Sequence, residues 1–304
     1  MDARYLGNLS QIVGIDRVRL CGGKGDGMPV LRLHNRFLTA DVLESKALDV
    51  GQVCYRGRNV SFLTKNGYDG CATKFSRAFC GGMLYTCGPE SVGDREGFPL
   101  HGSMHNIPAT VLRAEVTEEG DIIVQGEVRF TELFGADLCL KRTITLPHDV
   151  AVIRVEDELQ NRGFRTEKYC MLYHVNFGYP FLTENTTLCF DAESTRSRTE
   201  IAARHAESCK KMQPPEDNLF EFVYFHTLKT PHVVAESPDS GIKATLSYSG
   251  DSLPCFVEWK SMASGDYALG LEPATTFLDG EFRYRDLAAG AAVRQTVELG
   301  LEDL

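Results

Sequence analysis

Apolar residues recur at every second position through much of this chain, and this spacing restricts its fold more than any other feature. In residues 121–133 (DIIVQGEVRFTEL) the alternation gathers four apolar side chains on one face: Ile122, Val124, Val128 and Phe130. Residues 138–146 and 151–159 repeat the pattern. Side chains of a β-strand alternate between the two faces of a sheet, so each segment predicts a strand with one buried face. Short connectors at 134–136 and 147–149 predict antiparallel hairpins.

The same alternation predicts strands along the rest of the chain, in residues 29–43, 46–57, 167–182, 218–228, 241–249, 253–262, 266–274 and 292–301. Residues 199–210 (TEIAARHAESCK) are the best helical candidate. No change in composition and no Ser-, Gly- or Pro-rich linker divides the chain. We therefore expect an all-β fold in which residues 1–304 form a single domain, a sandwich of large antiparallel sheets with few short helices.

Charge and cysteine content restrict the partners and the compartment. The net charge is −10, and an acidic protein repels phosphate backbones and anionic membranes, so we expect neither nucleic acid nor a membrane as a partner. No apolar stretch is as long as a membrane helix, and residues 1–13 (MDARYLGNLSQIV) are charged and lack the apolar core of a signal peptide. The ten cysteines include no C-x-x-C pair. These features predict a cytoplasmic protein with reduced cysteines. They leave the oligomeric state open, and a homodimer is one arrangement that we consider.

Two of the eight histidines lie in one short segment, FPLHGSMHNIPA (residues 98–109). His101 and His105 flank a Gly-Ser turn, and Asn106 follows the second histidine. Three interpretations fit this pattern: a metal site, a polar site that binds a sugar, or a turn whose histidines only pack. Neighbouring metal ligands on a strand usually lie two positions apart, whereas these lie four apart, so the spacing favours sugar over metal.

Two ionisable residues interrupt apolar strands, where an unpaired charge is costly to bury. Glu272 ends the run YALGLE, and His174 follows the run CMLY with Asn176 two residues later on the same face. An exposed edge strand could explain Glu272, and a core imidazole bonded to a carbonyl could explain His174. The functional alternative is an acid and a base in one cleft. In that case we expect the two groups to face each other across room for a sugar ring.

Three more residues have side chains suited to ligand binding. Trp259 is the only tryptophan, and an indole face can stack on the C–H surface of a sugar. Lys260 follows it, and Arg77 lies shortly before a Gly-Gly pair that would let a ligand approach the backbone. Together with His105, these two cations could bind a carboxylate, a phosphate or a sulfonate.

Other classes of active site are less compatible with the sequence. A cupin-type metal site normally includes an H-x-H pair, and none occurs. A serine hydrolase of the α/β type would need a G-x-S-x-G elbow, which is missing. Residues 20–29 (LCGGKGDGMP) lack the complete phosphate-loop pattern and predict a turn.

Together, five short motifs resemble the aldose 1-epimerase superfamily, whose fold is that of galactose mutarotase. The motifs are GGMLYTCG (81–88), LHG (100–102), HVNFGYP (174–180), WK (259–260) and GLEP (270–273). ALDVG at 47–51 resembles an early strand of the same proteins. The chain is most similar to a branch of aldose-1-epimerase-like proteins of about this length, and the resemblance covers nearly all of it.

The resemblance implies a β-supersandwich and an isomerase that interconverts the anomers of a small sugar by acid–base ring opening, without a cofactor or a metal. By motif position, His174 takes the place of the superfamily's general acid and Glu272 that of its general base. His101 takes the place of the histidine that contacts the sugar near its ring oxygen. The other expected substrate contacts are His105, Asn176, Arg77, Lys260 and Trp259.

One departure from the family pattern concerns the substrate. Many relatives have an arginine directly after the His-Gly pair, and this chain has Ser103 there. We expect Arg77 or His105 to supply the missing polar contact. Two other functions remain open: a sugar-binding protein without catalysis, and a metal-assisted isomerase or lyase acting on an acidic sugar.

Overall fold

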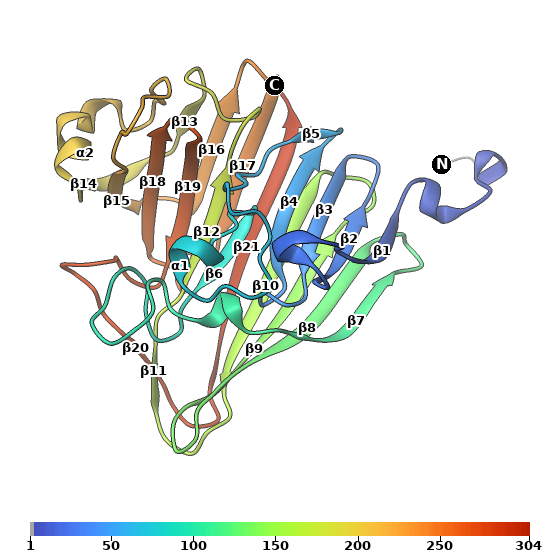
Figure 1. Cartoon of the computed structure of the whole chain (residues 1–304), viewed down its shortest axis with the longest axis horizontal. Coiled ribbons are helices and arrows are strands. Elements are labelled where there is room, and N and C mark those ends of the chain that lie inside the picture. Colours follow the sequence, from blue (N-terminus) through green and yellow to red (C-terminus); the bar gives the residue numbers. More distant parts are fainter. Residues whose placement is uncertain (1–2) are drawn as a thin grey trace.

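The computed structural model describes residues 3–304, which form 21 strands joined by short helices and turns (Figure 1). Every strand ladder is antiparallel. The two α-helices are Phe75–Ala78 (α1) and Glu200–Arg204 (α2). The 3-10 helices are Ala3–Tyr5 (η1), Leu9–Gln11 (η2), Gly23–Gly25 (η3), Met104–Asn106 (η4) and Ala206–Ser208 (η5). The prediction of an all-β fold with few short helices is confirmed.

The strands form four sheets. The five-stranded sheet contains, in order, Gly14–Arg19 (β1), Pro29–His34 (β2), Leu38–Leu43 (β3), Asp49–Tyr55 (β4) and Arg58–Asn59 (β5). The eight-stranded sheet contains, in order, Thr187–Cys189 (β13), His232–Ser237 (β16), Ile242–Tyr248 (β17), Ala292–Asp303 (β21), Val152–Asn161 (β10), Asp137–Leu146 (β9), Ile122–Thr131 (β8) and Thr110–Val116 (β7).

The six-stranded sheet, which carries the candidate site, contains in order Ala192–Ser197 (β14), Phe222–Leu228 (β15), Cys255–Ala263 (β18), Asp266–Ala274 (β19), Leu172–Phe177 (β12) and Leu84–Cys87 (β6). Glu167–Tyr169 (β11) and Arg285–Leu287 (β20) form a two-stranded sheet. An isolated bridge from Ser61 to Phe177 joins β12 of the six-stranded sheet to the chain that follows β5.

The largest of three hydrophobic core clusters lies between the three large sheets. It includes Leu33 of β2, Ile144 of β9 and Tyr173 of β12, all almost fully buried. Figure 1 shows the blue strands β2–β4 lying over the green strands of the eight-stranded sheet. Along β8, buried and partly exposed residues alternate from Ile122 to Val128, as the sequence predicts. The predicted helix at 199–210 is only partly present, because α2 ends before His205.

A buried ionic network ties this core together. The Arg142 guanidinium on β9 binds the Asp157 carboxylate through two bonds of 2.9 and 2.7 Å and the Asp49 carboxylate at 2.8 Å. It also donates to the Thr86 hydroxyl at 2.8 Å, and Tyr173 donates to Asp157 at 2.8 Å. The five residues belong to all three large sheets, so the network fixes how these sheets pack. Removing one partner would leave a buried charge without compensation.

All ten cysteines are free thiols, and half of them are buried. No helix among residues 3–304 has the length and apolar character to cross a membrane.

Candidate active site

The register of neighbouring strands brings the predicted acid and base together. β12 pairs with β19 so that Val175 lies opposite Leu271, and the same register places His174 opposite Glu272. Residues directly opposite each other on adjacent strands point to the same face of the sheet and contact each other. The structure therefore brings the two residues to one place.

The two side chains touch. His174 Nε2 lies 3.1 Å from Glu272 Oε1, and the residues are 4% and 1% exposed. The expectation that a sugar ring would fit between them is wrong, because cross-strand neighbours lie too close together to admit one. Both groups line the same pocket, so a ligand would meet them as a pair.

A glycine on β19 makes this close packing feasible. A Cβ atom at Gly270 would lie 2.6 Å from Glu272 Oε1, 2.9 Å from His174 Cε1 and 3.1 Å from Trp259 Cε3. The Trp259 ring lies edge-on to the His174 ring, with centroids 5.4 Å apart. Gly270 is thus the residue in the GLEP motif that lets three functional side chains share one face.

Burial decides the charge state of the pair. It raises the pKa of Glu272 well above its ordinary value; the charge of Glu221 acts in the same direction and that of Arg198 opposes it. Burial also lowers the pKa of His174 to about 3, against the effect of a hydrogen bond with Asn176. Both shifts favour the uncharged form of each group. The pair in the free protein therefore holds one transferable proton, on Glu272, beside a neutral imidazole.

The pocket around this pair has a volume of about 500 Å³, which is within the usual range for small-molecule sites. Its aromatic wall consists of Phe62, Phe75, Phe79 and Trp259. Its polar wall includes Thr64, Lys65, Asn66, Ser76, Asp94, His101, Arg198, Glu221, Ser261 and Asp266. A cavity with one aromatic face and many hydrogen-bonding groups suits a ligand that has an apolar face and several hydroxyls.

Comparison with known proteins identifies the family. A family model described as a domain of unknown function, DUF4432, matches residues 25–296. The chain belongs to this family. No protein with curated annotation matches the sequence.

Solved structures show the fold of this DUF4432 member. A protein from Klebsiella pneumoniae named "putative aldose 1-epimerase" is 20% identical, with a TM-score of 0.86 over 95% of this chain and 83% of that one. A galactose mutarotase-like protein from Clostridium acetobutylicum is 14% identical, with a TM-score of 0.74 over 97% and 100%. A galactose mutarotase related enzyme from Lactobacillus acidophilus is 11% identical, with a TM-score of 0.62 over 90% and 97%. The predicted galactose mutarotase-like fold is confirmed.

Of the two loop histidines in this DUF4432 chain, His101 lines the pocket. Its Nδ1 accepts a hydrogen bond of 3.3 Å from the Gly93 amide, so the neutral ring carries its proton on Nε2. Burial lowers the pKa of His101 to about 4, and the Arg198 charge adds to the shift. Its ring lies 5.9 Å from that of His174. His101 can therefore act as a neutral hydrogen-bond donor beside the buried pair.

The second histidine lies behind the pocket, which corrects the prediction of a sugar contact. His105 is buried and stacks on Tyr85 with ring centroids 4.1 Å apart, and its Nε2 lies 3.0 Å from the Asn106 amide nitrogen. Burial, with the charges of Lys46 and His101, lowers the pKa of His105 to about 3. Of the two histidines, His101 therefore lines the pocket and His105 only packs.

The two residues of the WK motif also differ in their position relative to the pocket. Consecutive residues of a strand point to opposite faces, so Trp259 on β18 faces the pocket and Lys260 faces the core. The Lys260 ammonium is fully buried and donates to the carbonyls of Cys209 and Lys211 at 2.7 and 2.9 Å. The prediction that Lys260 contacts substrate is corrected, since its side chain cannot reach the pocket.

The other two predicted contacts also lie outside the pocket lining. Asn176 is buried, and its amide nitrogen donates to the carbonyls of Gly82 and His174 at 3.0 and 2.9 Å. Asn176 therefore supports the strand that carries His174 instead of contacting a ligand directly. Arg77 is exposed on α1 and does not line the pocket, although its neighbours Phe75 and Ser76 do.

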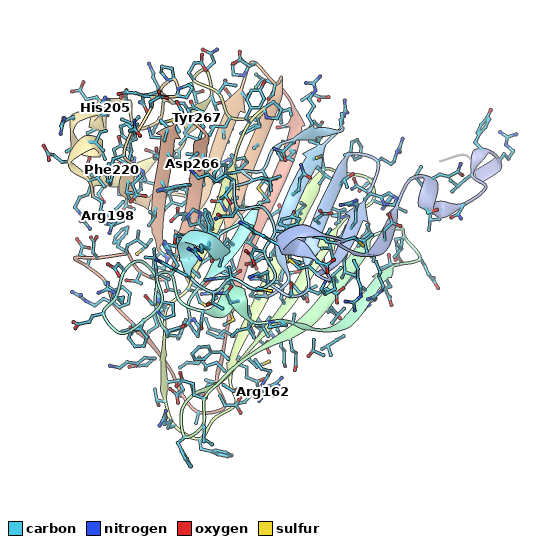
Figure 2. The ribbon with its side chains drawn as sticks, in the orientation of Figure 1. Arg162, Arg198, His205, Phe220, Asp266 and Tyr267 are labelled. Carbon is cyan, nitrogen blue, oxygen red and sulfur yellow. The ribbon has the colours of Figure 1, made fainter. Side chains whose placement is uncertain are left out.

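The charged residues that do line the pocket were missed by sequence analysis. Arg198 follows β14, donates to the Asp279 carboxylate at 2.5 Å and lies 4.0 Å from Glu221. Glu221 in turn accepts a 2.8 Å hydrogen bond from the Trp259 indole. On the other side, Lys65 binds Asp266 at 2.6 Å; Arg198 and Asp266 are labelled in Figure 2. These residues lie in loops or at the ends of strands, where polar side chains are usual, so the sequence carries no signal that sets them apart.

Among residues 3–304, no group of three or more His, Cys, Asp or Glu side chains has the geometry to hold a metal ion.

Proposed function

We propose that this chain is an aldose 1-epimerase that interconverts the anomers of a sugar without an anionic substituent. The observation that carries the proposal is the buried contact between His174 and Glu272 in the wall of a sugar-sized pocket. A carboxyl and an imidazole with strongly shifted pKa values inside a pocket are typical of acid–base catalysis.

Ring opening takes one proton from the substrate and gives one back. In the proposed mechanism the Glu272 carboxylate removes the proton of the C1 hydroxyl while the bond between C1 and the ring oxygen breaks. The His174 imidazolium donates its Nε2 proton to the departing ring oxygen. The C1–C2 bond of the open aldehyde then rotates, and the reverse transfers close the ring on either face. Proton transfers of this kind contribute roughly 10²–10⁴-fold to a rate.

The charge state of the pair supports this direction of transfer. Ring opening converts an imidazolium and a carboxylate into a neutral imidazole and a protonated carboxyl. Burial favours this second state, since it lowers the pKa of His174 and raises that of Glu272. The pocket would therefore stabilise the ring-opened state relative to the ion pair. In the free protein the proton lies on Glu272, and the 3.1 Å contact lets it pass to His174 to form the ion pair from which ring opening starts.

The charges around the pocket favour a substrate without an acidic group. Each lining cation is already bound to a carboxylate, Lys65 to Asp266 and Arg198 to Asp279. Asp94 is exposed in the pocket wall and has no ion pair or hydrogen bond with any residue from 3 to 304. A uronate, phosphate or sulfonate would meet these carboxylates, and none of the cations proposed from the sequence to bind such a group lies in the pocket.

The proposal is tested by NMR exchange spectroscopy of sugar anomers with the purified protein, over neutral aldoses, hexuronates and aldose phosphates. We expect accelerated exchange for at least one neutral aldose and none for the anionic sugars. Acceleration confined to anionic sugars would overturn the substrate class. Binding of neutral sugars without any acceleration would show a sugar-binding protein instead.

The metal-assisted alternative is tested in the same assay after dialysis against a chelator. We expect unchanged exchange rates. A loss of activity that Zn²⁺, Mn²⁺ or Fe²⁺ restores would establish a metal enzyme.

A further inference from the structure

We propose that two copies of this chain associate through an apolar tip formed by two neighbouring turns. The tip consists of Leu133 and Phe134 in the turn between β8 and β9, and Phe164 in the turn between β10 and β11. These side chains are 87%, 93% and 101% exposed. Figure 1 shows both turns at the lower end of the molecule. Contiguous large apolar side chains on a protein surface typically mark an interaction site.

Contacts between the two turns make the tip one surface. The Arg162 amide donates to the Asp137 carbonyl at 2.8 Å, which joins the end of β10 to the start of β9. The Arg165 guanidinium reaches the Phe134 carbonyl at 3.5 Å. The three apolar side chains are therefore presented together.

The turns are also held in place before any partner binds. The buried Asn161 amide donates to the carbonyls of Arg165 and Leu287, both at 2.8 Å, and its oxygen accepts from the Gly163 amide at 2.9 Å. Phe134 has a φ of +59°, a conformation that is uncommon for a residue with a side chain. A preformed surface loses little conformational entropy on association.

The charges around the tip favour a second copy over other partners. Three ion pairs flank the apolar residues, namely Arg129–Asp137 at 2.8 Å, Arg162–Glu127 at 2.5 Å and Arg165–Glu167 at 2.6 Å. Each cation in these pairs is balanced by a carboxylate, and the exposed Glu132 beside Leu133 is the remaining charge of the two turns, with no ion pair to any residue from 3 to 304. An identical surface therefore meets less repulsion here than the net charge of the whole chain would cause, as a two-fold interface requires. Most of a chain with net charge −10 would repel its copy, and an anionic membrane would need unpaired cations.

The size of the tip predicts a weak dimer. Two exposed phenylalanines and a leucine would bury roughly 500 Å² per copy, taking the usual area of aromatic side chains. A stable interface buries about 800 Å² on each partner. We therefore expect a dimer that dissociates on dilution, and this proposal does not depend on the proposed enzymatic function.

Sedimentation velocity over a dilution series of the full chain tests the proposal. The mass of the wild type should rise with concentration from 33.7 kDa toward twice that value. The double variant Phe134→Asn, Phe164→Ser should stay at 33.7 kDa throughout. Asparagine tolerates a positive φ, so this variant should fold, and an unchanged melting temperature verifies it. Phe220→Ser is the matched control. Phe220 is 80% exposed and lies far from the tip in Figure 2, so its variant should associate like the wild type.

Three results would overturn the proposal. The wild type could remain monomeric at every concentration, or the double variant could associate as strongly as the wild type. The third is flotation of the wild type, but not of the double variant, with phosphatidylcholine vesicles in the same buffer, which would make the tip a membrane-binding element.

Discussion

Replacing Gly270 by alanine should disable the site without unfolding the protein. The added Cβ would lie 2.6 Å from Glu272 Oε1, whereas ordinary contacts begin near 3.4 Å. The carboxylate or the strand must therefore move by roughly 0.8 Å, and a displacement of about 1 Å can cost about 10²-fold in rate. Overpacking of this kind also destabilises a protein by about 1–3 kcal/mol, which leaves a well-packed chain folded.

The matched control is Gly300→Ala. Gly300 lies on β21, and a Cβ there would meet nothing closer than 3.9 Å. Anomer-exchange NMR of both variants, with melting temperatures to verify folding, gives the comparison. We expect Gly270→Ala to lose about two decades of rate and Gly300→Ala to match the wild type. A Gly270→Ala variant with wild-type activity would refute the claim that the contact geometry of the pair governs the rate.

Three further predictions concern the buried polar residues. Burial lowers the pKa of His101 to about 4 and those of His105 and His174 to about 3, from an ordinary value of 6.5. Below pH 6.5 the unfolded chain therefore binds more protons at these three histidines than the folded chain does. The contribution of these histidines to the free energy of unfolding should therefore rise with pH from about 4.5 to 6.5, by up to about 1.4 kcal/mol per unit and histidine. The raised pKa values of Glu272, Glu90 and Asp49 act in the opposite direction, so the contribution of one histidine is measured as the difference between wild type and His105→Ala in urea titrations. A difference that does not change between pH 4.5 and 6.5 would contradict the burial of the His105 ring. His101→Ala should reduce the rate of anomer exchange and leave the melting temperature unchanged. His105→Ala should lower the melting temperature and leave the exchange rate of the folded protein near that of the wild type. The opposite pattern would place His105 in the site. Arg142→Met should cost about 3–5 kcal/mol in urea titration, because it leaves two buried carboxylates unpaired, and a loss below about 1 kcal/mol would show that the network is dispensable.

Alternation in the sequence was sufficient to predict most strands and the two residues that form the pair. Glu272 and His174 stand out because each interrupts a strand whose other residues are apolar. The same alternation could have excluded Lys260 from the expected substrate contacts, because a strand that points Trp259 into the pocket points the next residue to the opposite face. The family resemblance placed Trp259 and Lys260 in one site because they are adjacent in one motif. Adjacent residues of a strand point to opposite faces, so only one of the two can face the pocket.

The distance between the His174 and Glu272 side chains could not be predicted from the sequence, because it depends on strand register. Register follows from which strands pair across the sheet, and a shift by one residue would turn a side chain to the other face. The same limit applies to Arg198 and Lys65, which reach the pocket from segments far apart in the chain. Sequence distance gives no indication that they meet there.

The central claim is that Glu272 and His174 exchange protons with a sugar, and anomer exchange by the variants Glu272→Gln and His174→Asn tests it most directly. Glu200→Gln and His232→Asn change the same residue types at exposed positions and serve as controls. We predict that each pair variant keeps its fold and loses at least about two decades of the rate on the best neutral aldose, while both controls match the wild type. Exchange at the wild-type rate by folded Glu272→Gln would contradict the account, because another group would then have to be the base.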